Sequence, residues 1–411
     1  MTADRELVVE SIAAGGDGVA RDGGLVVFTP RTAPGDRALV GVQAKGRFAR
    51  GTLRRVLAPS AERVEPACPH YTRDRCGGCQ LQHLAYGAQL GAKRGIVGDA
   101  LARIGRRHVP DLNVQPSERQ WRYREKLTLA LRRDESGDWY GGLHPYDSPG
   151  RVFALADCPI TSERVVDAWR QILAASCHFP AARELRGAVR ALDDGVSFVL
   201  EGAAAWPSSA AFLSAAPLVS ALWWAPEGRR PQLVADRRVT RTPGASFAQV
   251  NPAVAAALRA RVVERVLEHA PRSVVDAYAG AGDTAALIAG HGARVTAIEI
   301  DRDASAWSAS RLPAGSRALA GRVEELIGDV LPADVVLVNP PRTGLDERVT
   351  AAIAGCTPAP RAVVYVSCNP ATLARDLTRL PAYRIRSLEA YDMFPQTAHV
   401  ETLCELVPEA A

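Results

Sequence analysis

The sequence has no long apolar run and very little lysine. No stretch approaches the roughly eighteen uncharged apolar residues of a membrane-spanning helix, and MTADRELVVE lacks the apolar core of a signal peptide. We therefore expect a cytoplasmic protein without a membrane partner. Abundant arginine and alanine beside scarce lysine indicate a GC-rich genome, and this overall bias says nothing about function. The 411 residues, 47% hydrophobic and 23% charged, predict two or three globular domains.

Charge is distributed unevenly along the chain. From Phe247 to the C-terminus there are 16 Lys/Arg against 19 Asp/Glu, whereas the preceding part has 34 against 26. A basic first part joined to a mildly acidic second part indicates a nucleic-acid-binding region attached to a separate chemical module, although many basic faces are only solvated.

Residues 1–60 alternate short apolar runs with glycine turns, as in LVVESIAAGGDGVARDGGLVVFTP. This pattern is typical of hairpins and predicts a small OB-like β-barrel. Its last strands contain five cations and no acid: Lys45, Arg47, Arg50, Arg54 and Arg55. These side chains are either a solvated strand face or contacts to nucleic-acid phosphates, and Phe48 among them favours phosphate contact.

Residues 61–245 form the region whose pattern is least informative. A Cys-bearing connector comes first, and a helical pattern follows from Leu90 to about Ile104. The rest is mostly strand-like, as in WRYREKLTLALRR and RVFALADCPI, with a helix near Glu163–Ala174. We predict a mainly β central domain.

Residues 246–411 alternate helices with apolar strands. A helix from about Asn251 precedes the strand SVVDA, and further strands are expected at Val295–Ile300, Ala333–Val338 and Ala362–Val366. Alternating β and α units of these lengths predict a doubly wound, Rossmann-like parallel sheet, so the whole chain is expected to be a multidomain α/β protein.

A nucleotide-like cofactor is expected at the first strand of this sheet. Strand, glycine-rich turn and helix meet at DAYAGAG, residues 276–282, and Glu299 at the end of the next strand can accept hydrogen bonds from ribose hydroxyls. A bare G-x-G could also serve NAD. The order D-x-x-x-G-x-G and the later Asn339-Pro-Pro-Arg342 favour S-adenosylmethionine.

Cys368 is the candidate nucleophile. It follows the apolar strand AVVYV and precedes a helix, so it lies at the ligand-binding edge of the sheet, where the helix N-terminus would stabilise a thiolate. Most free cysteines are small buried hydrophobes, and Cys356 and Cys404 fit that description.

Methylation at C5 of uracil would use such a thiolate. Addition at C6 makes C5 enolate-like, and a general base must then remove the C5 proton so that the thiolate can leave. The segment FPQTAHVET supplies an imidazole and the Glu401 carboxylate just before the last strand. Taken alone, this segment is an ordinary polar loop.

Four motifs in order, DAYAGAG, NPPRTG, SCNP and DMFPQTAHVET, strongly resemble the RNA uracil-5 methyltransferases. The resemblance covers essentially the full chain and is thin between about Ser176 and Pro243. It implies a TRAM module for the N-terminal strands, Cys368 as nucleophile and Glu401 as base. The S-adenosylmethionine contacts that it implies are Gln249, Tyr278, Asp283, Glu299 and Asn339.

Two of these positions depart from the family pattern. The family carries Asp where this chain has Asn339, and many members carry Asn where Asp283 stands. An amide can still hydrogen-bond, but it offers no negative charge near the sulfonium. A compensating charge exchange would require the two side chains to be close.

The connector offers four thiols as Cys68-x7-Cys76-Gly-Gly-Cys79 and Cys158-Pro159. Thiolate ligation suits zinc as well as an iron–sulfur cluster. The resemblance, carried by CGGCQLQH and CPI, implies a 4Fe-4S cluster at Cys68, Cys76, Cys79 and Cys158. The family's first gap is usually five residues and here is seven.

The expected activity is methyl transfer to uridine C5 in RNA, with 23S rRNA ahead of tRNA because a TRAM module together with a cluster is commoner in the ribosomal branch. Two alternatives are an RNA-binding protein with an impaired site, which Asn339 would favour, and methyl transfer to an exocyclic amine, which needs no Cys368. A large RNA partner makes a monomer the expected state.

Overall fold

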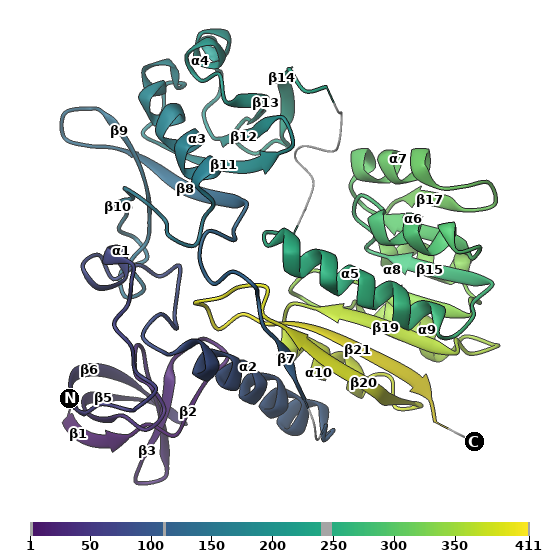
Figure 1. Cartoon of the computed structure of the whole chain (residues 1–411), viewed down its shortest axis with the longest axis horizontal. Helices are drawn as coiled ribbons and strands as arrows, with labels where there is room; N and C mark the ends of the chain where they lie inside the picture. Colours follow the sequence, from purple (N-terminus) through teal and green to yellow (C-terminus); the bar gives the residue numbers. More distant parts are fainter. Residues whose placement is uncertain (1–2, 110–111, 240–248, 410–411) are drawn as a thin grey trace.

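The computed structural model describes residues 3–109, 112–239 and 249–409. Three β-sheets follow one another along the chain, and helices pack mainly on the second and third (Figure 1). This arrangement confirms the multidomain α/β prediction. Among the described residues, no helix has both the length and the apolar character needed to cross a membrane.

The first sheet is formed by the N-terminal strands in the order β1-β5-β6-β4-β3-β2. Neighbours are antiparallel except β4 and β6, and a small core including Leu7, Val27 and Val40 lies beneath them. Its strands are β1 (Ala3–Val8), β2 (Ser11–Ile12), β3 (Gly18–Asp22), β4 (Leu25–Thr29), β5 (Arg37–Lys45) and β6 (Phe48–Ala58). Closure into an OB-like barrel stays a prediction.

The connector leads from this sheet into a long helix. The short helix α1 (Pro69–Thr72) is followed by α2 (Tyr86–Ala100), which continues as a π-helical turn over Leu101–Gly105. The helix predicted from Leu90 to about Ile104 is confirmed and begins four residues earlier. After it, β7 (Val114–Gln115) pairs with the edge of the third sheet.

The second sheet makes up the central region, in the order β10-β9-β8-β11-β12-β13-β14. The helix predicted near Glu163–Ala174 is present as α3, whose apolar face packs Trp169 edge-on against Phe198. The remaining elements are β8 (Lys126–Arg133), β9 (Trp139–Leu143), β10 (Phe153–Ala154), a 3-10 turn (Ser176–His178), β11 (Glu184–Leu192), β12 (Gly195–Glu201), α4 (Ser209–Ala215), β13 (Val219–Ala225) and β14 (Gln232–Asp236).

The third sheet has the order β17-β16-β15-β18-β19-β21-β20-β7. Its first five strands are parallel, and β21 runs antiparallel to both neighbours. Apart from β7, the strands of this sheet are β15 (Ser273–Ala277), β16 (Arg294–Glu299), β17 (Arg317–Ala320), β18 (Val335–Val338), β19 (Ala362–Ser367), β20 (Tyr383–Tyr391) and β21 (Glu401–Pro408). The four predicted strands, which are β15, β16, β18 and β19, are confirmed within two residues.

Helices cover both faces of this sheet and form two apolar cores. One core contains α5 and α6, and the other contains α8, α9, α10 and α2. The helices are α5 (Pro252–Leu267), α6 (Asp283–Gly290), α7 (Arg302–Arg311), α8 (Val323–Val330), α9 (Glu347–Ala354) and α10 (Pro370–Thr378). Because β15 to β19 are parallel, their carboxyl ends meet at one edge.

The predicted division at 60/61 and 245/246 stays a prediction. The 245/246 boundary lies outside the described residues. Within the interval 61–245, α2 packs against α10 and β7 joins the third sheet, so this interval contributes to two parts of the molecule.

Candidate active site

A cavity of about 1670 Å³ lies at the carboxyl ends of the third sheet and is closed on another side by the central sheet. Its lining includes Arg124 and Lys126 beside β8, Arg190 from β11, and the turns after β15, β18 and β19. All seven predicted catalytic and cofactor residues line it: Gln249, Tyr278, Asp283, Glu299, Asn339, Cys368 and Glu401.

The turn after β15 is shaped by left-handed backbone. Tyr278, Gly280 and Gly282 have φ values of 63°, 56° and 76°. A Cβ added at Gly282 would lie 2.0 Å from the Ser308 hydroxyl oxygen, so glycine is required there by space as well as by φ. Glu299 fixes the turn, since its carboxylate accepts hydrogen bonds from the Gly280 and Asp301 main-chain nitrogens, each at 2.8 Å.

The charged side chains near this turn bear on the expected charge exchange between Asp283 and Asn339. The Asp283 carboxylate pairs with Arg259 at 3.3 Å and with Arg311 at 2.9 Å, so two guanidinium groups already lie beside its charge. Asn339 is exposed to the cavity. The fully buried Asp276 supplies another carboxyl, and burial together with the Glu299 charge raises its pKa to about 7.

Cys368 and Glu401 are brought together by strand pairing. In the antiparallel pair β19–β21, Ser367 is opposite Thr402, so the next residues, Cys368 and Glu401, lie across from each other where the strands end. The Thr402 hydroxyl donates to the Ser367 carbonyl oxygen at 3.0 Å and strengthens this pairing. Glu401 is 2% exposed, whereas Cys368 is half-buried at the cavity wall.

The ionisation of this pair is set by burial and by Arg342. Burial and the nearby Glu401 charge raise the pKa of the Cys368 thiol, so the resting side chain is a thiol despite the following helix. Burial raises the pKa of the Glu401 carboxyl to about 7, partly offset by a Gln249 hydrogen bond and the Arg342 charge. Arg342 also hydrogen-bonds to Cys368 and lowers the pKa of its thiol.

Sequence reasoning did not assign Arg342, Arg124 or Lys126 to the site. Arg342 had a signal, because it ends the NPPR motif that follows β18 at the same sheet edge as Cys368. Arg124 and Lys126 lie just before and at the start of β8 in the second sheet, and the basic character of their segment WRYREK is the signal that could have pointed to them. His399 is a neutral imidazole, because burial lowers its pKa to about 4.

The four connector cysteines lie together and are all buried, between 6% and 9% exposed. The charges of Cys68, Cys76 and Cys158 each raise the pKa of the Cys79 thiol, which shows their proximity. Among the residues described, no three His, Cys, Asp or Glu side chains converge closely enough to ligate one metal ion. Zinc and an iron–sulfur cluster both take thiolate ligands, so the identity of a metal group at these four cysteines stays a prediction.

Comparisons with known proteins agree on one enzyme class. A family model described as tRNA (Uracil-5-)-methyltransferase matches residues 305–407. The 23S rRNA (uracil(1939)-C(5))-methyltransferase of Dechloromonas aromatica is 31% identical, over 96% of this chain and 98% of that protein. A protein of Protochlamydia amoebophila, described only as an RNA methyltransferase, is 30% identical over 97% and 96% of the two chains.

A solved structure extends the likeness to the fold. The tRNA (uracil-54, C5)-methyltransferase of Pyrococcus abyssi, in complex with S-adenosyl-L-homocysteine, aligns with a TM-score of 0.72. The alignment covers 98% of this chain and 99% of that one at 22% identity, so all three sheets have counterparts in a single known architecture.

Proposed function

Because this chain belongs to the RNA uracil-5 methyltransferase family, we propose that it methylates C5 of a uridine in 23S rRNA with S-adenosylmethionine as methyl donor. The observation that carries the mechanism is the pairing of Cys368 with Glu401 at the end of β19 and β21. The ribosomal substrate is supported by the full-length relative of Dechloromonas aromatica, which is 31% identical, whereas the structurally similar tRNA enzyme is 22% identical.

The substrate is tested by mapping 5-methyluridine in rRNA and tRNA from a strain that lacks the gene. We expect one 23S rRNA uridine to lose its methyl group and the purified protein to restore it on protein-free rRNA. Loss of the modification from tRNA alone would contradict the ribosomal assignment and leave the reaction class intact.

The cavity residues account for each chemical step. Arg342 beside Sγ favours the thiolate of Cys368, which adds to C6 of the uracil ring. Carbon 5 then attacks the methyl group, and the methyl–sulfonium bond breaks to release S-adenosylhomocysteine. Glu401 accepts the C5 proton, the C5–C6 double bond re-forms and the thiolate leaves.

The methyl donor is assigned to the glycine turn after β15. The glycines of this turn let a ligand come close to the main chain, and Glu299 at the end of β16 lies where the ribose hydroxyls are expected. Gln249, Tyr278, Asp283 and Asn339 complete the proposed contacts. Asp276 also lines the cavity and is proposed to supply the negative charge that Asn339 lacks, and a cationic sulfonium bound beside it would lower its raised pKa.

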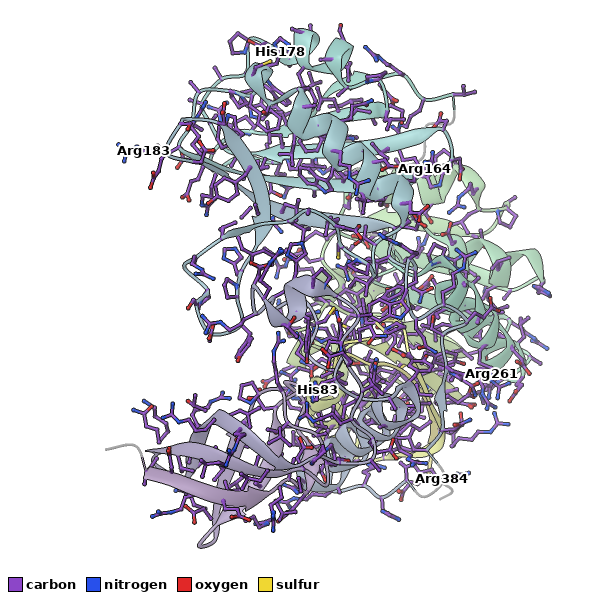
Figure 2. All side chains as sticks on the ribbon, turned by 60° about the vertical axis from the view of Figure 1, so that its left-hand side comes forward. His83, Arg164, His178, Arg183, Arg261 and Arg384 are labelled. Atoms are coloured by element: carbon purple, nitrogen blue, oxygen red, sulfur yellow. The ribbon has the colours of Figure 1, made fainter. Side chains whose placement is uncertain are left out.

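We propose that Cys68, Cys76, Cys79 and Cys158 hold a 4Fe-4S cluster, in which each of the four thiolates would bind one iron. The connector that carries Cys68, Cys76 and Cys79 is tied to its surroundings at several points. The Cys68 main-chain nitrogen donates to Gln82 Oε1 at 3.3 Å. His83 links the Tyr71 hydroxyl at 2.7 Å with the Thr32 carbonyl oxygen at 3.1 Å, between the first sheet and the rest of the chain (Figure 2).

We expect protein purified without oxygen to contain iron and inorganic sulfide in equal amounts. Cys79→Ser should remove most of both, because the remaining thiolates leave one iron without its protein ligand. Elemental analysis and sulfide determination measure this, with Cys177→Ser, an exposed cysteine outside the group, as the control. One zinc per chain with no sulfide would contradict the assignment.

A further inference from the structure

The loop between β20 and β21, residues 392–400, is held in an uncommon conformation. It reaches from the third sheet toward the connector (Figure 1), carries the cavity-lining Phe394, and ends at Glu401. Gln396 has a φ of 71°, a left-handed value that non-glycine residues rarely adopt. Such a conformation persists only where the surrounding contacts determine it.

Two distant segments supply those contacts at Gln396. Its main-chain nitrogen donates to Gln89 Oε1 at 2.9 Å, and Gln89 Nε2 donates to Gln396 Oε1 at 3.0 Å. The Gln396 carbonyl oxygen accepts from the main-chain nitrogens of Gln80 and Leu81 at 3.1 and 2.9 Å. Every hydrogen bond of this set links the loop to α2 or to the connector, so the loop's shape depends on both.

Lys93, one turn beyond Gln89 on α2, adds a buried ion pair. Its ammonium donates to the Asp392 carboxylate and, at 3.0 Å, to the Phe394 carbonyl oxygen. Lys93 and Asp392 are both fully buried. The chain has only three lysines among its 50 Lys and Arg residues, and at this position the compact ammonium donates to two oxygens of the loop.

We propose that Lys93 and Gln89 are positioning residues for removal of the C5 proton, an inference that rests on the function proposed above. They act through the 392–400 loop, which sets Phe394 against the bound base and Glu401 beside C5. Loosening this loop leaves Cys368 free to add and the methyl group free to transfer. It slows proton removal, so the covalent, methylated intermediate accumulates.

The test compares Gln89→Leu and Lys93→Met with the wild-type protein on unsubstituted RNA. We expect kcat to fall roughly 10- to 100-fold, the cost of misplacing a catalytic group by about an ångström, with the KM for S-adenosylmethionine unchanged. A denaturation-resistant protein–RNA complex should build up in both variants. Arg103→Met is the matched control, because Arg103 makes an exposed ion pair with Asp99 on the same helical segment.

Lys93→Met leaves the buried Asp392 carboxylate without its partner, whereas Gln89→Leu leaves no buried charge behind. If Lys93→Met does not fold, Gln89→Leu alone tests the positioning role. Wild-type kcat without accumulation in Gln89→Leu, or a raised KM for RNA at unchanged kcat, would overturn the positioning role. Failure of the wild-type protein itself to form 5-methyluridine would instead refute the proposed function, so the two failures are distinguishable.

Discussion

Replacement of Cys368 by alanine is expected to lower methyl transfer to RNA by roughly 10⁴-fold or more, the scale of losing a covalent nucleophile. Without the thiolate, C5 of the uracil ring never gains enolate character and cannot attack the methyl group. Transfer of labelled methyl from S-adenosylmethionine into 23S rRNA measures the loss. Affinity for S-adenosylmethionine should be unchanged, because its proposed contacts lie elsewhere in the cavity, before α5, in the turns after β15 and β18, at the end of β16 and at the start of α6.

The control for this variant is Cys177→Ala, at an exposed cysteine outside the cavity lining. It should methylate RNA at the wild-type rate. Full activity of Cys368→Ala would refute covalent catalysis and would favour methyl transfer to an exocyclic amine, which needs no nucleophile.

Glu401→Gln is expected to lower turnover by about 10²- to 10⁴-fold, the usual contribution of a general base. The amide keeps the size of the side chain but cannot accept the C5 proton. Addition of Cys368 should continue, and should become easier at a given pH, because the Glu401 charge contributes to the raised pKa of the thiol. The covalent complex with unsubstituted RNA should therefore accumulate while product formation stops.

The pH dependence follows from the same carboxyl. Glu401 must be deprotonated to act as a base, and burial has raised its pKa to about 7, against the opposing effects of Gln249 and Arg342. Decay of the preformed covalent complex should therefore slow about tenfold per pH unit below pH 7 and level off above it. Pre-steady-state decay rates from about pH 5.5 to 9 test this, and a flat profile in the wild-type protein would exclude Glu401 as the base.

Local patterns in the sequence were enough to predict the parallel strands β15, β16, β18 and β19 of the third sheet and the places of Glu299 and Cys368 along the chain. The glycine turn, the acid Glu299 and the strand-end Cys368 are each encoded within a few neighbouring residues, and parallel strands bring such ends to one edge. The relation between Cys368 and Glu401 required the topology, because β21 inserts between β19 and β20. From its local pattern alone, the segment FPQTAHVET was interpreted as an ordinary polar loop.

Contacts between distant segments were not predictable from local patterns. Lys93 and Asp392 are 299 positions apart, and nothing in the helical pattern of α2 distinguishes Lys93 from a solvated cation. The pairing of β7 with the third sheet and the packing of α2 against α10 were missed for the same reason. Asp283 was expected as a possible exchange partner for Asn339, and its ion pairs with Arg259 of α5 and Arg311 of α7 could not be read from local patterns either.

The most direct test of covalent catalysis at Cys368 uses RNA containing 5-fluorouridine. Fluorine at C5 cannot be removed as a proton is, so the reaction stops after methyl transfer with the protein still attached to the base. Mass spectrometry of the digested complex should find a peptide in which Cys368 carries a nucleotide with both fluorine and the transferred methyl group, formed only with S-adenosylmethionine. Attachment at another cysteine, or 5-methyluridine formed from ordinary RNA by a protein that gives no such complex, would contradict the account.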